Sequence, residues 1–207
     1  MIDKDETQYK IIPWTTDIDL TKYYSMAYDR GFFNNSSQKN MIDCFKNERE
    51  SQTWIMFYKD KPAGSVACHT LDIMGPTAYR ILARCCVMVG VTGQKGMSTI
   101  NLGIRQHQSF TDQVFMPACI EWAGRDKDLY VTTNDLPIAT QRLSHRIWAP
   151  THAESGILEN VGEKEYRGTI QTFWKLDVER FYNSLNKFPR WNIYAEVPVS
   201  KLIQPLF

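Results

Sequence analysis

The segment 79–106, YRILARCCVMVGVTGQKGMSTINLGIRQ, constrains the fold more than any other part of the sequence. Its first half is dense in apolar and β-branched residues, which is typical of a central strand covered on both faces. Strict alternation would place one set of side chains on one face, namely Ile81, Ala83, Cys85, Val87 and Val89. The opposite face would carry Arg80, Leu82, Arg84, Cys86 and Met88.

Three glycines, Gly90, Gly93 and Gly96, follow this strand within seven residues. Apolar residues at helical spacing come next, at Met97, Ile100 and Ile104. A strand, a glycine-bearing loop and a helix in this order direct backbone N–H groups and the positive end of the helix dipole at one spot. An anion can be bound there without a dedicated side chain. An ordinary strand-to-helix turn has the same order, so the surrounding elements must decide between the two interpretations.

The composition sets limits on the class of protein. A chain of 207 residues suits one domain, expected over 1–185, followed by a proline-containing tail over 186–207 that packs on the body or on a partner. The net charge of +1 provides no field for nucleic acid. No apolar run approaches the roughly 20 residues of a membrane span, so we expect a soluble, cytoplasmic protein. Five cysteines without C-x-x-C and four dispersed histidines predict neither a disulfide scaffold nor a metal site.

The apolar periodicity predicts an α/β fold around a mixed, mostly antiparallel sheet flanked by helices, with a C-terminal helix and an extended tail. The expected strands are 9–14, 53–58, 63–72, 79–89, 129–133, 157–161 and 166–176. The expected helices are 16–31, 36–49, 97–104, 117–124, 134–149 and 177–185. Turns at Asp60 and at Gly75-Pro76 are too short for crossovers, so 53–90 should form three consecutive antiparallel strands. A further turn is expected at 162–165, and Pro150 should end the helix before it.

This order of elements resembles the GNAT superfamily of acetyl-CoA-dependent N-acetyltransferases over residues 9–176. The loop 93–98 is similar to the family's pyrophosphate-binding pattern Q/R-x-x-G-x-G/A. Gly96 stands at the required glycine and Ser98 at the final small residue, while Gly93 replaces the usual Gln or Arg and Gln94 follows one place later. Asn134 ends the predicted fifth strand, as in the family.

The resemblance implies that an amine of a small molecule or of a protein attacks the thioester of acetyl-CoA directly. It also implies a set of cofactor-binding residues, namely Val87, Val89, Gln94, Lys95, Gly96, Met97, Ser98 and Asn134. The tyrosine that commonly protonates the leaving thiolate has no counterpart at 141–143, and the nearest proton donors are Ser144 and His145. A homodimer is a further expectation, and nucleic acid and membrane partners are not expected.

Several roles stay open at this point. Asp72, His69 and Glu121 are candidates for the general base. Arg80 and Arg84 either form internal ion pairs or bind a substrate carboxylate. The chain could instead be a GNAT-shaped binding or structural module without catalysis. A thiol enzyme using Cys85 or Cys86 is a weaker alternative, because no base partner is recognisable.

Overall fold

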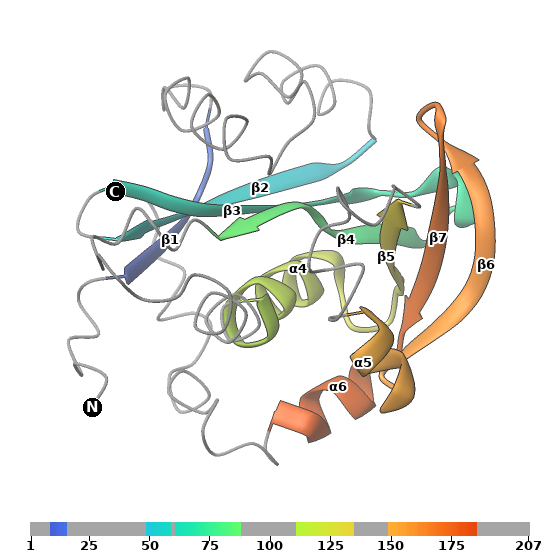
Figure 1. Cartoon of the computed structure of the whole chain (residues 1–207). Helices are drawn as coiled ribbons and strands as arrows, with labels where there is room; N and C mark the ends of the chain where they lie inside the picture. The colour runs from blue at the N-terminus through green and yellow to red at the C-terminus, as the bar shows by residue number, and fades with distance from the viewer. Residues whose placement is uncertain (1–8, 16–48, 59–60, 88–110, 135–148, 186–207) are drawn as a thin grey trace, which may run out of the picture.

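The structure, a computed structural model, describes residues 9–15, 49–58, 61–87, 111–134 and 149–185. Within these residues seven strands form one open sheet in the order β1-β2-β3-β4-β5-β7-β6 (Figure 1). Their bounds are β1 Tyr9–Pro13, β2 Ser51–Tyr58, β3 Lys61–Thr70, β4 Ala78–Val87, β5 Asp128–Asn134, β6 Leu158–Tyr166 and β7 Thr169–Leu176. Among these described strands only β4 and β5 pair in parallel, and every other pair of neighbours is antiparallel. The predicted α/β class with a mixed, mostly antiparallel sheet is confirmed.

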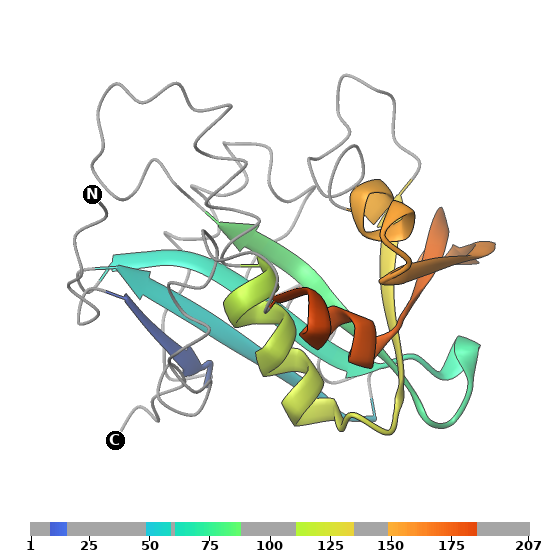
Figure 2. The same cartoon turned by 90° about the horizontal axis from the view of Figure 1, so that it is seen from below.

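The described α-helices are α4 (Met116–Ala123), α5 (Ala149–Glu154) and α6 (Val178–Leu185). A π-helical turn, Thr111–Phe115, leads directly into α4. All three α-helices lie on the same side of the sheet, as the two views together show (Figures 1 and 2). We call this side the helix face.

The main core lies between the sheet and these helices. Its fully buried members include Phe115, Met116, Ile120 and Phe181 from the helical segments and Ile81 from β4. A smaller cluster, made of Leu71, Ala78, Tyr130 and Phe173, packs on the other side of the sheet. Phe173 and Trp174 are neighbours on β7 that belong to different clusters, so the two clusters occupy opposite faces. We call the second side the Phe173 face.

Several predicted elements are confirmed. Residues 51–87 contain three consecutive antiparallel strands, β2, β3 and β4. The link between β3 and β4 includes one 3-10 turn, Asp72–Met74, where the sequence indicated only a turn. The helix predicted over 117–124 is α4, and it ends at Gly124. Asp177 caps α6, since its Oδ1 accepts a hydrogen bond from the Arg180 N–H at 2.9 Å.

Three predictions were wrong. The last hairpin turns at Arg167-Gly168, with φ of 54° and 74°, rather than at 162–165. Two successive positive φ values are what a tight two-residue hairpin needs, whereas Gly162 occupies a register shift within β6. The strand predicted to begin at 166 therefore begins at Thr169. Pro150 does not end a helix but lies at the start of α5, where proline is tolerated because the first turn has no internal partner for its nitrogen.

The alternation expected along β4 was also wrong. Arg80 pairs with His69, Ala83 with Ala67 and Cys86 with Ser65, so β4 advances three residues for every two of β3, twice in succession. Two bulges account for this, and one of them includes Leu82, whose φ is 53°. The helices predicted over 16–31, 36–49 and 97–104, most of the helix over 134–149, and the tail lie outside the described residues.

Candidate functional site

The parallel strands β4 and β5 pair over only three residues each. The pairs are Ala78 with Asp128, Tyr79 with Leu129 and Arg80 with Tyr130. Beyond them the two strands diverge (Figure 2), although both continue as strands to Val87 and Asn134. We call residues 81–87 and 131–134 the β4–β5 splay. Backbone groups on its two inner edges have no strand partner in the described part of the sheet, so they can bind an extended ligand inserted between them.

The bulges in β4 explain why the strands separate. A bulge bends its strand and increases the local twist, and both bulges of β4 fall within the splay. Leu82 adopts a positive φ that a leucine rarely takes. Such backbone strain concentrates at ligand-binding sites.

The predicted cofactor residues fall into two groups. Val87 and Asn134 end the two arms of the splay, where Val87 pairs outward with Gly64 and Asn134 with Gln171. The rest lie outside the described residues, namely Val89, Gln94, Lys95, Gly96, Met97 and Ser98. The proton donors Ser144 and His145 and the side chain of Arg84 also lie outside them.

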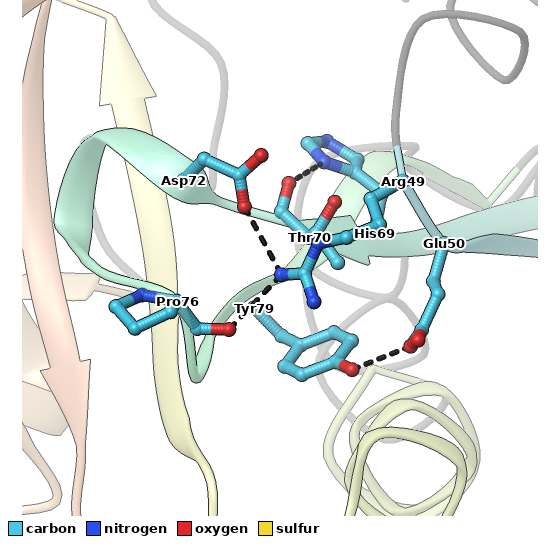
Figure 3. A network of polar contacts seen from close by, with 7 residues as sticks. All are labelled: Arg49, Glu50, His69, Thr70, Asp72, Pro76 and Tyr79. Carbon is cyan, nitrogen blue, oxygen red and sulfur yellow. Dashed lines mark hydrogen bonds and ion pairs between the residues drawn. The ribbon is translucent and has the colours of Figure 1, made fainter.

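The paired end of β4 is held by a polar network (Figure 3). Arg49 donates to Asp72 Oδ1 at 3.1 Å and to the Pro76 carbonyl at 3.0 Å, which ties the start of β2 to the β3–β4 link. Tyr79 donates its hydroxyl to Glu50 at 2.5 Å, and this hydrogen bond raises the pKa of Tyr79. Asp72 thus makes an exposed ion pair at the paired end of the two strands, and its catalytic role stays a prediction.

His69 is the candidate base nearest in register to Arg80, with which it pairs across β3 and β4. Paired residues share a sheet face. His69 is 4% exposed, and its Nδ1 lies 2.7 Å from the Thr70 carbonyl oxygen. A carbonyl oxygen only accepts, so Nδ1 carries a proton and the neutral ring has its lone pair on Nε2. Glu121, the third candidate, accepts from Arg125 and from Tyr182 on the helix face.

The Arg80 guanidinium lies over the ring of Tyr166, with Cζ 5.4 Å from the ring centroid. Arg167 approaches the same ring at 5.2 Å. Sequence reasoning proposed Arg80 but missed Tyr166 and Arg167, because they are 86 residues or more distant in the chain. The only local signal for Arg167 was the glycine after it, which permits a tight turn.

A largely buried contact between a histidine and a carboxylate was missed as well. His152 Nε2 on α5 lies 3.3 Å from Asp112 Oδ1 in the π-helical turn, and both side chains are 11% exposed. The pair joins α5 to the segment that leads into α4. Forty residues separate the two positions, so no local spacing indicates the contact.

The remaining predictions concern thiols, metals and membranes. Cys68 and Cys119 are free and buried, and burial raises the pKa of the Cys68 thiol, which disfavours the reactive thiolate. The side chains of Cys85 and Cys86 lie outside the described residues. The described residues contain no cluster of three metal-ligating side chains. None of the helices within 9–15, 49–58, 61–87, 111–134 and 149–185 is long and apolar enough to cross a membrane.

No family model and no curated protein matches the sequence. Solved structures do match the fold. The aminoglycoside acetyltransferase AAC(6′)-Ib in complex with coenzyme A and kanamycin has a TM-score of 0.52 at 10% identity, over 85% of this chain and 98% of that chain. A proposed GNAT-family acetyltransferase from Desulfovibrio desulfuricans has a TM-score of 0.50 at 12% identity, over 82% of this chain and 99% of that chain. The chain therefore has the fold of the GNAT acetyltransferases.

Proposed function

We propose that the protein transfers an acetyl group from acetyl-CoA to the amine of a small molecule or protein. The observation that carries this proposal is the β4–β5 splay, in which two central parallel strands part after three residue pairs. Strands in the middle of a sheet rarely leave their backbone groups unpaired without another partner. The amide-rich pantetheine arm of CoA is such a partner, because it can hydrogen-bond to both strands.

The loop 93–98 would bind the pyrophosphate. In the sequence it begins six residues after Val87, the last residue of β4, and precedes a run of helical periodicity, so its N–H groups and the helix dipole can neutralise an anion. Lys95 would add a positive charge. The bound acetyl-CoA of a solved structure with the same fold, AAC(6′)-Ib, supports this choice of co-substrate.

In the proposed reaction the amine nitrogen attacks the thioester carbonyl carbon. A C–N bond forms and the C–S bond breaks, while the amine loses one proton and the CoA thiolate gains one. N–H groups on the inner edge of β4 within the splay would stabilise the negative oxygen that develops on the carbonyl. Asp72 or His69 would accept the amine proton, and Ser144 or His145 would protonate the thiolate.

Calorimetry with acetyl-CoA tests the proposal on wild type, on Gly96→Glu and on Asn183→Glu as a control that adds the same charge on α6. Gly96→Glu adds bulk and negative charge beside the pyrophosphate, so binding should weaken by about 3 kcal/mol, a factor of about a hundred. Asn183→Glu should bind as wild type does. Unchanged affinity of a folded Gly96→Glu variant for acetyl-CoA would show that the pyrophosphate binds elsewhere.

Turnover decides between the enzyme and the non-catalytic module. Wild-type protein with acetyl-CoA and a panel of amines should release free thiol. Binding of acetyl-CoA without thiol release for any amine would instead favour a GNAT-shaped binding module.

A further inference from the structure

The described sheet consists of two halves that meet along one short line of pairing. Strands β1 to β4 form one half, and β5, β7 and β6 form the other. Within the described residues only three residue pairs, between β4 and β5, join the halves as a sheet, and the two strands diverge beyond them. Contacts that cross this line on the helix face therefore limit how far the two arms of the splay can separate.

Each half carries its own helical segments. The π-helical turn and α4 contact β4, and Cys119 Sγ on α4 lies 3.9 Å from the Ala67 carbonyl oxygen of β3. The short helix α5 contacts β6. Its His152 carbonyl accepts a hydrogen bond from the Ile157 N–H at 2.9 Å. The Ile157 carbonyl in turn accepts from the N–H of Asp177, directly after β7. The π-helical turn thus belongs to the β4 half, and α5 belongs to the β5 half.

Polar contacts join the helical segments of the two halves. One is the hydrogen bond from Tyr182 on α6 to Glu121 on α4, at 2.9 Å. Another is the contact between His152 Nε2 and Asp112 Oδ1 at 3.3 Å, in which each side chain is only 11% exposed. We call it the Asp112–His152 contact. Because both side chains are largely shielded from water, solvent competes little with their interaction.

The Asp112–His152 contact lies on the splay side of the paired residues. Trp122, near the end of α4, packs edge-on against Tyr79, a paired residue of β4, at a centroid distance of 5.9 Å. Asp112 precedes Trp122 by ten residues of continuous helical structure, which span about 15 Å at 1.5 Å per residue. Figure 2 shows that α4 runs from the end of β4 back toward the start of β5. Asp112 is therefore displaced from the paired residues toward the splay.

The order of the chain gives this contact a further property. The segment that leaves the β4 arm after Val87 reaches Asp112 before α4 begins. The segment that leaves the β5 arm after Asn134 reaches His152 in α5. Each arm of the splay is thus followed by a segment that arrives at one member of the pair. The contact closes a ring around the opening, with the β4–β5 pairing on the other side of the ring.

We infer that Asp112 and His152 are positioning residues for acetyl-CoA, because their contact holds the two arms of the splay at the separation that the pantetheine arm requires. A ligand that hydrogen-bonds to both strands needs both edges within hydrogen-bond distance at once. A preset separation removes the cost of ordering the two arms on binding. This inference rests on the proposed function, and it adds how the width of the same site is set.

Calorimetry with two ligands tests this role. Acetyl-CoA has the pantetheine arm, whereas 3′-phosphoadenosine 5′-diphosphate retains the pyrophosphate and lacks the arm. His152→Ala should bind acetyl-CoA about tenfold or more weakly than wild type, which is a usual size for the coupling of residues in contact. It should bind the nucleotide with unchanged affinity. A general loss of stability in a protein that remains folded would not separate the two ligands.

A double-mutant cycle isolates this contact from the other interactions of the two side chains. Asp112→Ala should lose as much affinity for acetyl-CoA as His152→Ala, and the double variant should lose no more than either. His152→Gln places an amide nitrogen near the position of Nε2 and should restore part of the affinity. The matched control is Tyr182→Phe, which removes a contact between the same two halves nearer the paired end. This control should keep the wild-type ratio of the two affinities.

Hydrogen exchange without ligand tests whether the contact holds the halves together. The Asp128 N–H donates to the Thr77 carbonyl at 3.3 Å, between the paired starts of β5 and β4. In His152→Ala the amides that pair these two strands should exchange about tenfold or more faster than in wild type. The amides of the β2–β3 hairpin lie within one half and should change less.

The inference is overturned if the variants weaken both ligands equally or neither, or if the losses add in the double variant. It is also overturned if exchange rises no more between β4 and β5 than in the β2–β3 hairpin. Failure of acetyl-CoA to bind wild type would overturn the proposed function. The exchange experiment uses no ligand, so the two failures are observed separately.

Discussion

Two adjacent threonines on β5 differ in what their hydroxyl groups contact. Thr133 Oγ1 accepts a hydrogen bond from Trp174 Nε1 at 2.8 Å, whereas Thr132 Oγ1 is buried and has no partner in the described part of the chain. Valine has nearly the same shape but no hydroxyl. Thr132→Val should therefore raise the free energy of unfolding by about 1 kcal/mol. Thr133→Val should lower it by about 1–3 kcal/mol, because it leaves an indole N–H without a partner.

Urea unfolding of the two variants provides the measurement. Equal destabilisation by both substitutions would show that the Thr132 hydroxyl has a structural partner.

Tyr182 makes a residue-scale prediction about pH. Burial, and then its hydrogen bond to Glu121 at 2.9 Å, raise the pKa of the Tyr182 phenol above the ordinary range. A raised pKa means that the folded state holds this proton more tightly than the unfolded state. The contribution to stability is complete below about pH 10, the unfolded pKa, and is lost as the pH rises toward the folded pKa.

In Tyr182→Phe the fall of unfolding free energy above about pH 10 should accordingly be less steep than in wild type. The hydrogen bond itself should contribute about 1 kcal/mol near neutral pH. Urea unfolding near neutral pH measures the contribution of the hydrogen bond, and urea unfolding above about pH 10 measures the alkaline slope. An identical alkaline slope in the variant would contradict the assigned pKa shift.

At the scale of elements, α6 depends on its cap. Asp177 accepts from the Arg180 N–H, and its own N–H donates to the Ile157 carbonyl at 2.9 Å, so it fixes both the start of the helix and its position beside β6. Asp177→Ala should lower the free energy of unfolding by about 1 kcal/mol. Asp177→Ser, which keeps a capping oxygen, should lower it by less. Thermal unfolding followed by circular dichroism distinguishes the two. Equal losses would mean that the ion pair with Arg180, rather than the cap, stabilises α6.

The elements that the sequence predicted best have strong local signals. β2, β3 and β4 are apolar runs separated by short turns, and α6 has a cap followed by apolar residues at i, i+3 and i+4. The β6–β7 hairpin was misplaced because β6 is exposed along nearly its whole length and has no apolar alternation. Charges at Glu163, Lys164 and Glu165 suit an unpaired edge strand, since they oppose pairing with another chain. In the sequence, however, this charged run resembles the polar residues of a turn.

At the scale of the whole molecule, contacts between residues that are distant along the chain could not be predicted from the sequence. The succession of strands along the chain and the strand end at Asn134 could be predicted because each depends on neighbouring residues. The approach of Arg80 and Arg167 to one ring, and the pairing of Asp112 with His152, depend on how distant elements meet. The bulges in β4 also escaped prediction, because a bulge is a relation between two strands and a single strand's composition does not reveal it.

The β4–β5 splay leads to a prediction for hydrogen exchange. Successive amides of a strand point to alternate sides, so about half of those in 81–87 face β3 and about half face the splay. The second group, together with its counterparts in 131–134, should exchange much faster than the amides of the β2–β3 hairpin. Adding CoA should slow exchange in the splay to a greater extent than in that hairpin, which serves as the control for general stabilisation by a ligand. If the splay amides are already protected without CoA, the two strands are closed in solution and the geometric argument for a CoA site fails. If CoA slows both segments equally, it binds elsewhere on the folded protein.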